Sequence, residues 1–344
     1  MRKTMILLAA FLVAALLAPL TASAQSTPVV DLKFQGLEPL GASLVYEGWL
    51  VIDGTPQSTG TFNVDSLGNF VNVINKPVAN AAAATAFVLS IEPVVDPDPA
   101  PADTKVLGGA FANGVAQLSI SHPAALGTDF SGTSGGFIVA TPTTSADDDE
   151  YSGVWFLDPT AGPGPSLELD ELPAGWYYEG WVVVDGQALS TGRFLTATGA
   201  DDFGGFSGPN GNPPFPGEDF IVNAPAGLTF PTNLAGSTVV VSVEPEPDDS
   251  PAPFALKPLV GNVPGDVTIG AVNPLGAGPV GITGTATLNN ASAAAASGDA
   301  GAAPAQAELA FTGVESWYLA GAATLAIAMG AAFVMTSRLS LIHI

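Results

Sequence analysis

Residues 43–62 read SLVYEGWLVIDGTPQSTGTF, and residues 175–194 repeat the pattern as GWYYEGWVVVDGQALSTGRF. About half of the positions are identical at an offset of 132 residues, including Tyr-Glu-Gly-Trp, Asp-Gly and Ser-Thr-Gly. A second pair of blocks, residues 88–109 and 240–261, follows at an offset of 152. Two blocks that recur in the same order indicate a repeated domain, and the larger second offset implies about twenty extra residues in the second copy.

The pattern within each repeat is typical of an all-β protein. Runs rich in Val, Ile and Phe are separated by Gly and Pro at short intervals, and Asp-Gly after the first run predicts a tight hairpin. We therefore expect two tandem β-sandwich domains at residues 25–142 and 151–288, joined by the acidic linker 143–150. The last strand of each domain is expected at residues 137–141 and 280–288, respectively.

The residues that the two copies share are the candidate core of each domain. They are Tyr46, Trp49, Asp53 and Gly54 in the first copy and Tyr178, Trp181, Asp185 and Gly186 in the second. A tryptophan in the middle of an aliphatic strand favours a role in the core over stacking on a ligand. The phenylalanine-rich insertion at residues 200–217 is interpreted either as a binding loop or as a surface loop tethered by its apolar side chains.

The N-terminal residues 1–24 have the three parts of a secretory signal peptide. Arg2 and Lys3 precede an apolar run at residues 5–17, and Ala22 and Ala24 form an A-x-A signal peptidase site. The pattern predicts cleavage after Ala24 and a secreted mature chain.

The C-terminal region is similar to a sortase sorting signal of the LAxTG type. Its pentapeptide is Leu309, Ala310, Phe311, Thr312 and Gly313, and it follows a small-residue stalk at residues 289–308. An apolar stretch at residues 317–336 is long enough for a transmembrane helix and precedes Arg338, so the whole signal spans residues 309–338. The resemblance implies that a sortase cleaves after Thr312 and joins it to an envelope amine. The alternative is a plain membrane anchor.

The final residues 339–344, LSLIHI, do not fit the basic tail expected after such a signal. Their codons match the end of a common sequencing adapter, so we expect this tail to be non-native.

The repeat core resembles the extracytoplasmic C-terminal domain of the anti-sigma-K factor family. The matching segments are residues 46–54 and 178–186, Ser-Thr-Gly at 58–60 and 190–192, and the Glu-Pro segments that start at residues 91 and 243. The resemblance implies a β-sandwich outside the membrane. Family members that restrain a sigma factor carry a cytoplasmic helical domain before a membrane span, whereas here a signal peptide precedes the first repeat, so sigma-factor inhibition is not carried over.

The amino-acid composition makes some kinds of ligand and site more plausible than others. With 8 Lys+Arg against 32 Asp+Glu, the formal net charge is −24, which disfavours nucleic-acid binding because no basic face is available. The chain has no cysteine, so disulfides and thiolate sites are excluded. Clustered loop carboxylates make calcium the candidate cofactor, with Asp96, Asp98, Asp248 and Asp249 as its ligands. The alternative is that these loops are simply solvated.

No catalytic motif is recognisable, and no catalytic residue is assigned. His122 is the only histidine in the repeats and precedes a proline at a strand end, which favours a turn over a catalytic triad. We therefore expect a non-enzymatic protein anchored to the cell wall or to the outer face of the cytoplasmic membrane, displaying two domains for adhesion, binding or sensing of an extracellular partner. One alternative is a sensory component of an anti-sigma-factor system, and another is a carboxylate-dependent surface hydrolase.

Overall fold

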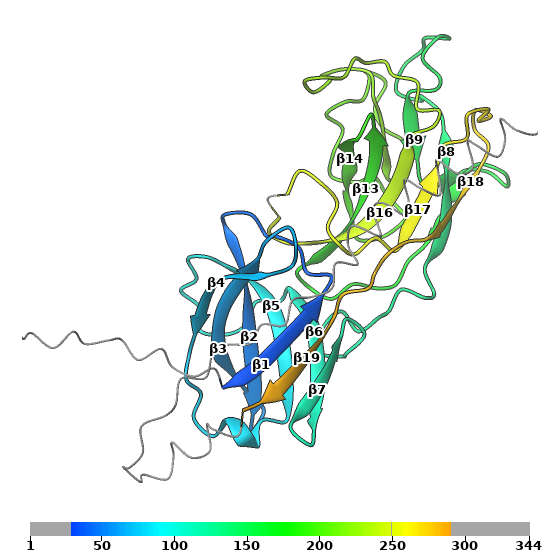
Figure 1. Ribbon diagram of the computed structural model, residues 1–344. Coiled ribbons are helices and arrows are strands. Elements are labelled where there is room, and N and C mark those ends of the chain that lie inside the picture. The colour runs from blue at the N-terminus through cyan, green and yellow to red at the C-terminus, as the bar shows by residue number, and fades with distance from the viewer. Residues whose placement is uncertain (1–28, 249, 290–344) are drawn as a thin grey trace, which may run out of the picture.

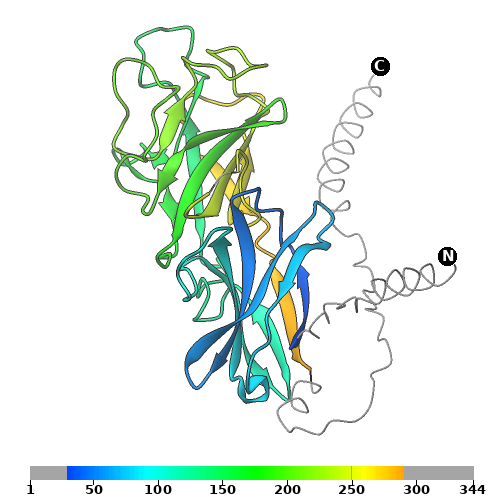
Figure 2. The same cartoon turned by 90° about the vertical axis from the view of Figure 1, so that its left-hand side faces the viewer.

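The computed structural model describes residues 29–248 and 250–289 and divides them into two lobes stacked end to end (Figures 1 and 2). Both lobes consist of β-strands and loops, and the described residues contain no α-helix but one short 3₁₀ turn, η1 (Ala81–Ala83). The expectation of an all-β fold is thus confirmed.

Lobe 1 is one eight-stranded sheet in the order β1-β19-β7-β6-β5-β2-β3-β4, and all its pairings are antiparallel. Its strands are β1 (Val30–Gln35), β2 (Leu44–Ile52), β3 (Thr55–Val64), β4 (Phe70–Asn75), β5 (Ala86–Pro93), β6 (Lys105–Ala112), β7 (Val115–Ser119) and β19 (Thr283–Leu288). The sheet curls, so that Phe34 of β1 packs against Phe62 of β3 and Phe70 of β4, with ring centroids 5.5 and 5.9 Å apart. These rings form part of the core that the curled sheet encloses.

Lobe 2 is a second curled sheet in the order β14-β13-β16-β17-β18-β8-β9-β15, and β12 also pairs with β8. Its strands are β8 (Ser134–Val139), β9 (Gly153–Trp155), β12 (Leu167–Glu168), β13 (Trp176–Val184), β14 (Gln187–Phe194), β15 (Gly217–Asp219), β16 (Thr238–Pro245), β17 (Leu259–Asn262) and β18 (Asn273–Ala277). A separate two-stranded ribbon is formed by β10 (Leu157–Asp158) and β11 (Gly164–Pro165).

Equivalent strands lie in the same spatial order in the two sheets, but they do not follow one another in the same order along the chain. Strands β19-β7-β6-β5-β2-β3 of lobe 1 correspond to β8-β18-β17-β16-β13-β14 of lobe 2. The expected domain ranges, 25–142 and 151–288, would place β8 in the sheet of the first repeat and β19 in the sheet of the second. In the structure, β8 instead joins the sheet of the second repeat, and β19 lies between β1 and β7 in the sheet of the first (Figure 1).

The repeated Asp-Gly and Ser-Thr-Gly sequences have backbone functions. Asp53 and Gly54 form the two-residue turn between β2 and β3 with φ values of 51° and 75°, and Asp185 and Gly186 do the same in lobe 2. Positive φ at both turn positions is what an Asp-Gly hairpin supplies at low cost. The glycine of each Ser-Thr-Gly has φ 114° next to a register shift, where the neighbouring chain leaves no room for a side chain.

The insertion at residues 200–217 takes the place that β4 occupies in lobe 1. In lobe 1, Gly60 lies opposite Asn75 of β4. In lobe 2, the side chain of Asp201 lies against the corresponding Gly192, and the Asp202 N–H donates to the carbonyl oxygen of Arg193 at 3.1 Å. The insertion then enters β15, which pairs with β9 at the sheet edge. The additional residues therefore replace an edge strand by an irregular cover.

The predicted signal peptide, most of the stalk, the sorting signal and the tail at 339–344 lie outside the described residues. Within the described ranges, no helix is long and apolar enough to cross a membrane.

Candidate functional site

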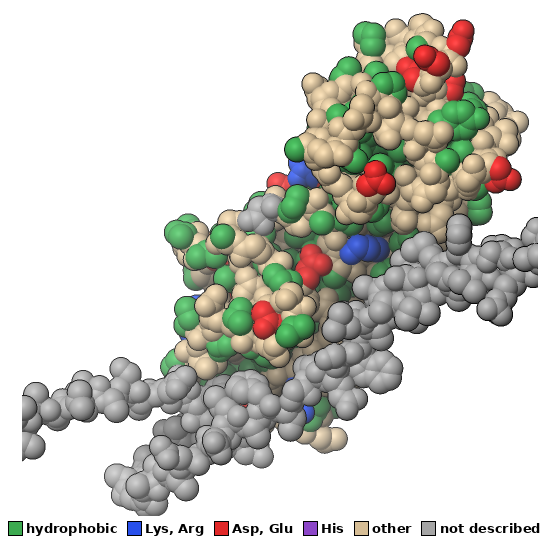
Figure 3. All heavy atoms as spheres, turned by 45° about the horizontal axis from the view of Figure 1, so that its top comes forward, with side chains coloured by type: hydrophobic (Ala, Val, Ile, Leu, Met, Phe, Trp, Pro, Cys, Tyr) green, Lys and Arg blue, Asp and Glu red, His purple; other side chains and the backbone are tan. Residues whose placement is uncertain are grey.

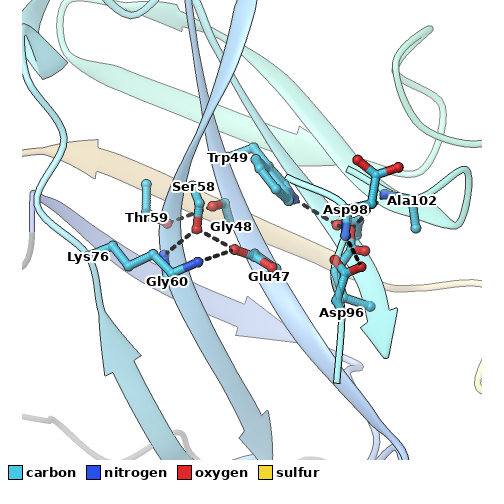
Figure 4. A network of polar contacts seen from close by, with 12 residues as sticks. Glu47, Gly48, Trp49, Ser58, Thr59, Gly60, Lys76, Asp96, Asp98 and Ala102 are labelled. Carbon is cyan, nitrogen blue, oxygen red and sulfur yellow. Dashed lines mark hydrogen bonds and ion pairs between the residues drawn. The ribbon is translucent and has the colours of Figure 1, made fainter. Parts of the chain in front are cut away.

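The residues shared by the repeats form a polar network on the face of the sheet opposite to the core (Figure 4). In lobe 1, Trp49 Nε1 donates to Ser90 Oγ at 2.8 Å, and Ser90 donates to Glu92 Oε1. The Ala102 N–H donates to the same carboxylate oxygen at 2.8 Å. Strand β2 thereby holds β5, and β5 holds the proline-rich loop that follows it.

A second branch of the network centres on Glu47. Ser58 of β3 and Lys76 both donate to Glu47 Oε1, the lysine at 3.0 Å. Figure 4 shows Lys76 and Ser58 reaching Glu47 while Trp49 points away from them. The Lys76 side chain is 50% exposed and that of Glu47 only 7%. The ion pair therefore joins a nearly buried carboxylate to a lysine at the surface.

Lobe 2 reproduces both branches. Trp181 Nε1 donates to Ser242 Oγ at 2.8 Å, Ser242 donates to Glu244, and the Phe254 N–H donates to Glu244 Oε1 at 2.9 Å. Glu179 accepts a hydrogen bond from Ser190, as Glu47 does from Ser58. The hydrogen bonds of the network thus recur in both repeats, whereas among the described residues Glu179 has no ion pair like that of Glu47 with Lys76.

Arg193 of lobe 2 pairs with carboxylates of two different segments. It contacts Asp202 of the insertion, with Nη2 3.0 Å from Oδ2, and also pairs with Glu246. Its guanidinium carbon lies 5.4 Å from the centre of the Tyr177 ring. These contacts fasten the insertion to the loop after β16.

The tyrosine of each repeat fixes the segment that precedes its strand. Tyr46 Oη donates to the carbonyl oxygen of Glu38 at 2.9 Å, and Tyr178 Oη donates to that of Asp170 at 2.8 Å. Both rings are completely buried. A buried phenol needs such a partner, so this contact is part of the packing of each lobe.

Burial controls the acid–base properties of the network. Burial raises the pKa of Glu244 to about 8 and that of Glu179 to about 7, although hydrogen bonds from Ser242 and Ser190 act in the opposite direction. The pKa of Glu92 is also raised, chiefly by burial. A carboxylic acid with a pKa near 7 is suited to general acid catalysis. However, Glu92 and Glu244 are only 2% and 0% exposed and their donors are already in place, so a substrate does not reach them.

Lobe 2 contains a further buried polar cluster that the repeats do not share. Asp219 Oδ1 accepts from Trp155 Nε1 at 2.7 Å, and its Oδ2 accepts from the N–H and the hydroxyl of Thr143. The adjacent Glu218 is completely buried and makes no hydrogen bond of good geometry, although the Ser207 side chain and the Phe206 backbone lie close enough to lower its pKa. Burial raises the pKa of Glu218 to about 7. A neutral Glu218 avoids leaving an uncompensated charge in this interior.

The carboxylates predicted to bind calcium do not converge. Asp96 and Asp98 lie in an exposed loop, where each accepts a backbone N–H two residues further on, and Asp248 accepts the Ser250 N–H in the same way. Asp249 lies outside the described residues. In the ranges that the structure describes, no group of three or more Asp, Glu, His or Cys side chains is placed to hold a metal ion.

A groove of about 400 Å³ lies in lobe 2 and is separate from the repeat network. It is lined by Asp158 and Glu168 together with small residues of β8, β11 and β18. Ser134 donates to Glu168 at 3.2 Å, and the Thr160 N–H donates to Asp158 at 2.8 Å. None of the residues shared by the repeats lines this groove.

The face of the molecule seen in Figure 3 carries no single acidic patch. Acidic side chains on the face seen in Figure 3 are scattered over both lobes rather than gathered. In the insertion, Phe203 and Phe206 pack together with centroids 5.1 Å apart, and Phe206 packs on Phe220 and Phe230. These contacts agree with the interpretation of the insertion as a surface loop tethered by apolar side chains.

Sequence reasoning emphasised the tyrosines, tryptophans and turns, and it missed the hydrogen-bonding partners Ser58, Ser90 and Glu92 and their counterparts in lobe 2. The signal was present, because Ser-Thr-Gly and Ser-x-Glu-Pro recur in both repeats. By contrast, Glu218 and Asp219 belong to no repeated block. The chain matches no family model, no curated protein and no solved structure.

Proposed function

We propose that the protein is a non-catalytic extracytoplasmic display protein, exported by the signal peptide, anchored through residues 309–338, and extending lobe 2 away from the envelope. The observation that carries this proposal is the position of the two ends of the described region, Val29 and Asn289. The Asn289 N–H donates to the carbonyl oxygen of Val29 at 3.1 Å, and Val30 lies opposite Leu288 in the sheet. Both ends therefore lie together at the end of lobe 1 remote from lobe 2 (Figure 1).

A non-catalytic role is supported by the state of the repeated side chains. Their hydrogen-bonding groups are directed at one another and are buried, and the groove of lobe 2 is built from other residues. Such a network connects strands and loops but leaves no group free to act on a substrate. The resemblance of the repeats to an extracytoplasmic sandwich domain agrees with this role.

Anchoring is tested by the mature C-terminus of protein released from the envelope of native cells. Mass spectrometry is expected to find a chain that ends at Thr312 and carries an envelope-derived amine. A chain that continues intact through Arg338 would contradict sortase anchoring and leave a plain membrane anchor.

Orientation is tested separately by labelling intact cells, which is straightforward because the chain has no cysteine. Ser145→Cys is placed at an exposed position of lobe 2, and Ala112→Cys at an exposed position beside the chain ends in lobe 1. A bulky membrane-impermeant maleimide should label Ser145→Cys faster, whereas both should react equally in purified protein. Equal rates on cells would refute the extended orientation.

A further inference from the structure

The two lobes differ in how the chain builds them. All strands of lobe 2 come from the contiguous segment 134–277. Lobe 1 combines strands of residues 30–119 with β19 at residues 283–288, so lobe 2 is inserted into lobe 1. Two connections, residues 120–133 and 278–282, join the lobes.

Strand β19 is an interior strand of the lobe 1 sheet, although it comes last in the described chain. It pairs with β1 along six residues and with β7 along five (Figure 1). Among the described strands, β1 pairs with β19 alone. Until β19 lies between them, the backbone N–H and C=O groups of β1 and β7 that point toward its position have no hydrogen-bond partner. Burying such unpaired groups costs free energy.

The slot for β19 accepts only a small residue at one position. A Cβ added to Gly284 would lie 2.6 Å from the ring of Phe34 and 2.8 Å from the carbonyl oxygen of Lys33. Two residues later, Ala286 is completely buried opposite Ala116 of β7 and Leu32 of β1. The sequence TGTATL of β19 therefore matches the shape of the slot as well as its hydrogen-bonding pattern.

We propose that β19 is a closing strand: the segment 134–277 forms lobe 2 without it, and lobe 1 stays open between β1 and β7 until residues 283–288 insert. An exported chain emerges N-terminus first, so lobe 1, which contains the N-terminal strands, is completed last. The open slot recognises an extended peptide with a glycine at the position of Gly284, supplied by the same chain.

The first test is Gly284→Val in the full chain, with hydrogen exchange followed by mass spectrometry. The valine side chain would meet Phe34, so β1 and β7 should exchange at least about tenfold faster than in the wild type, while β13 and β16 of lobe 2 keep their protection. Gly281→Ala is the matched control, because nothing lies within 4 Å of a Cβ at this connector position. Loss of protection in both lobes, or in neither, would overturn the proposal.

The second test supplies the strand in trans. A synthetic peptide of residues 280–289 should bind the Gly284→Val chain saturably and restore protection to β1 and β7, and it should not bind the wild type, whose slot is filled. The same peptide carrying Gly284→Val should have no effect. If the wild-type peptide does not restore protection, or if both peptides act alike, the slot does not recognise this strand and the proposal fails.

Discussion

The buried carboxyl of Glu244 should make the stability of lobe 2 depend on pH. Its side chain is completely buried, and burial raises its pKa from 4.5 to about 8, with Glu179 and Asp248 as further contributions in the same direction. Because the folded state binds the proton more tightly than the unfolded state, Glu244 contributes stability that is fully present below pH 4.5. This stability is lost as the pH rises toward 8.

The size of the effect follows from the width of this pH window. Each pH unit between 4.5 and about 8 removes roughly 1.4 kcal/mol, so the sum is on the order of 5 kcal/mol. That is a large share of the roughly 5–15 kcal/mol by which a domain is stable. Glu244→Gln removes the titration but keeps an oxygen that can accept from Ser242 and the Phe254 N–H.

The assay is urea unfolding at pH 5, 6, 7 and 8, followed by tryptophan fluorescence. The free energy of unfolding of Glu244→Gln, relative to the wild type, should increase with every pH step, and the variant should be the more stable protein at pH 8. The comparison with the wild type at each pH cancels the titration of other buried acids. Glu171→Gln, a change at an exposed position of the same lobe, is the control. Parallel pH profiles for the wild type and Glu244→Gln would refute the reasoning.

Three further changes test the other buried contacts. Trp181→Phe removes the donor to Ser242 and should lower the free energy of unfolding by about 1–3 kcal/mol in urea titrations. Gly180→Ala places a methyl group 2.2 Å from Thr191 Oγ1 and should cost about 1–3 kcal/mol by the same assay. Glu218→Gln should leave the thermal midpoint unchanged at pH 5 and raise it above pH 7, since burial raises the pKa of this acid to about 7 and the glutamine cannot ionise.

Each of these three predictions has an outcome that would contradict it. A Trp181→Phe protein as stable as the wild type would show that the indole contact does not hold β13 to β16. Gly265→Ala is the control for Gly180→Ala, because a Cβ there meets nothing within 4 Å, and equal losses for the two would exclude a packing effect. A pH-independent change for Glu218→Gln would mean that Glu218 is already ionised in the folded protein.

Much of the local structure could be predicted because its signals are local. Runs of apolar residues and Asp-Gly pairs identify β2, β3, β13 and β14, and the offsets between repeats locate the insertion. The shared tryptophans are buried, at 2% exposure for Trp49 and 4% for Trp181. Their hydroxyl and carboxylate partners could not be predicted in the same way, since the pairing of Trp49 with Ser90 joins residues 41 positions apart.

The sheet to which a short strand belongs could not be predicted, because a strand signal is local and its pairing is not. Residues 283–288 read TGTATL, which is compatible with a strand in either lobe. Neighbouring strands in sequence pair more often than distant ones, so the expectation of two separate tandem domains followed the usual rule. In the structure, the crowding of Gly284 against Phe34 distinguishes the correct slot, and this contact spans 250 residues.

The nested arrangement gives the duplication a mechanical consequence. A tandem pair joined by a single linker can pivot, whereas these lobes are connected by both 120–133 and 278–282. A hydrogen bond reinforces the first connection, because the hydroxyl of Thr128, within residues 120–133, donates to Asp170 of lobe 2 at 2.5 Å. Gly175 also packs against the backbone of Asp103 and Thr104. Only five residues separate β18 from β19, so in the proposed anchored arrangement a load between the anchor and lobe 2 would pass directly along this connection. In the proposed envelope-anchored arrangement, the insertion of lobe 2 into lobe 1 would therefore tie the displayed lobe directly to the anchored side of lobe 1.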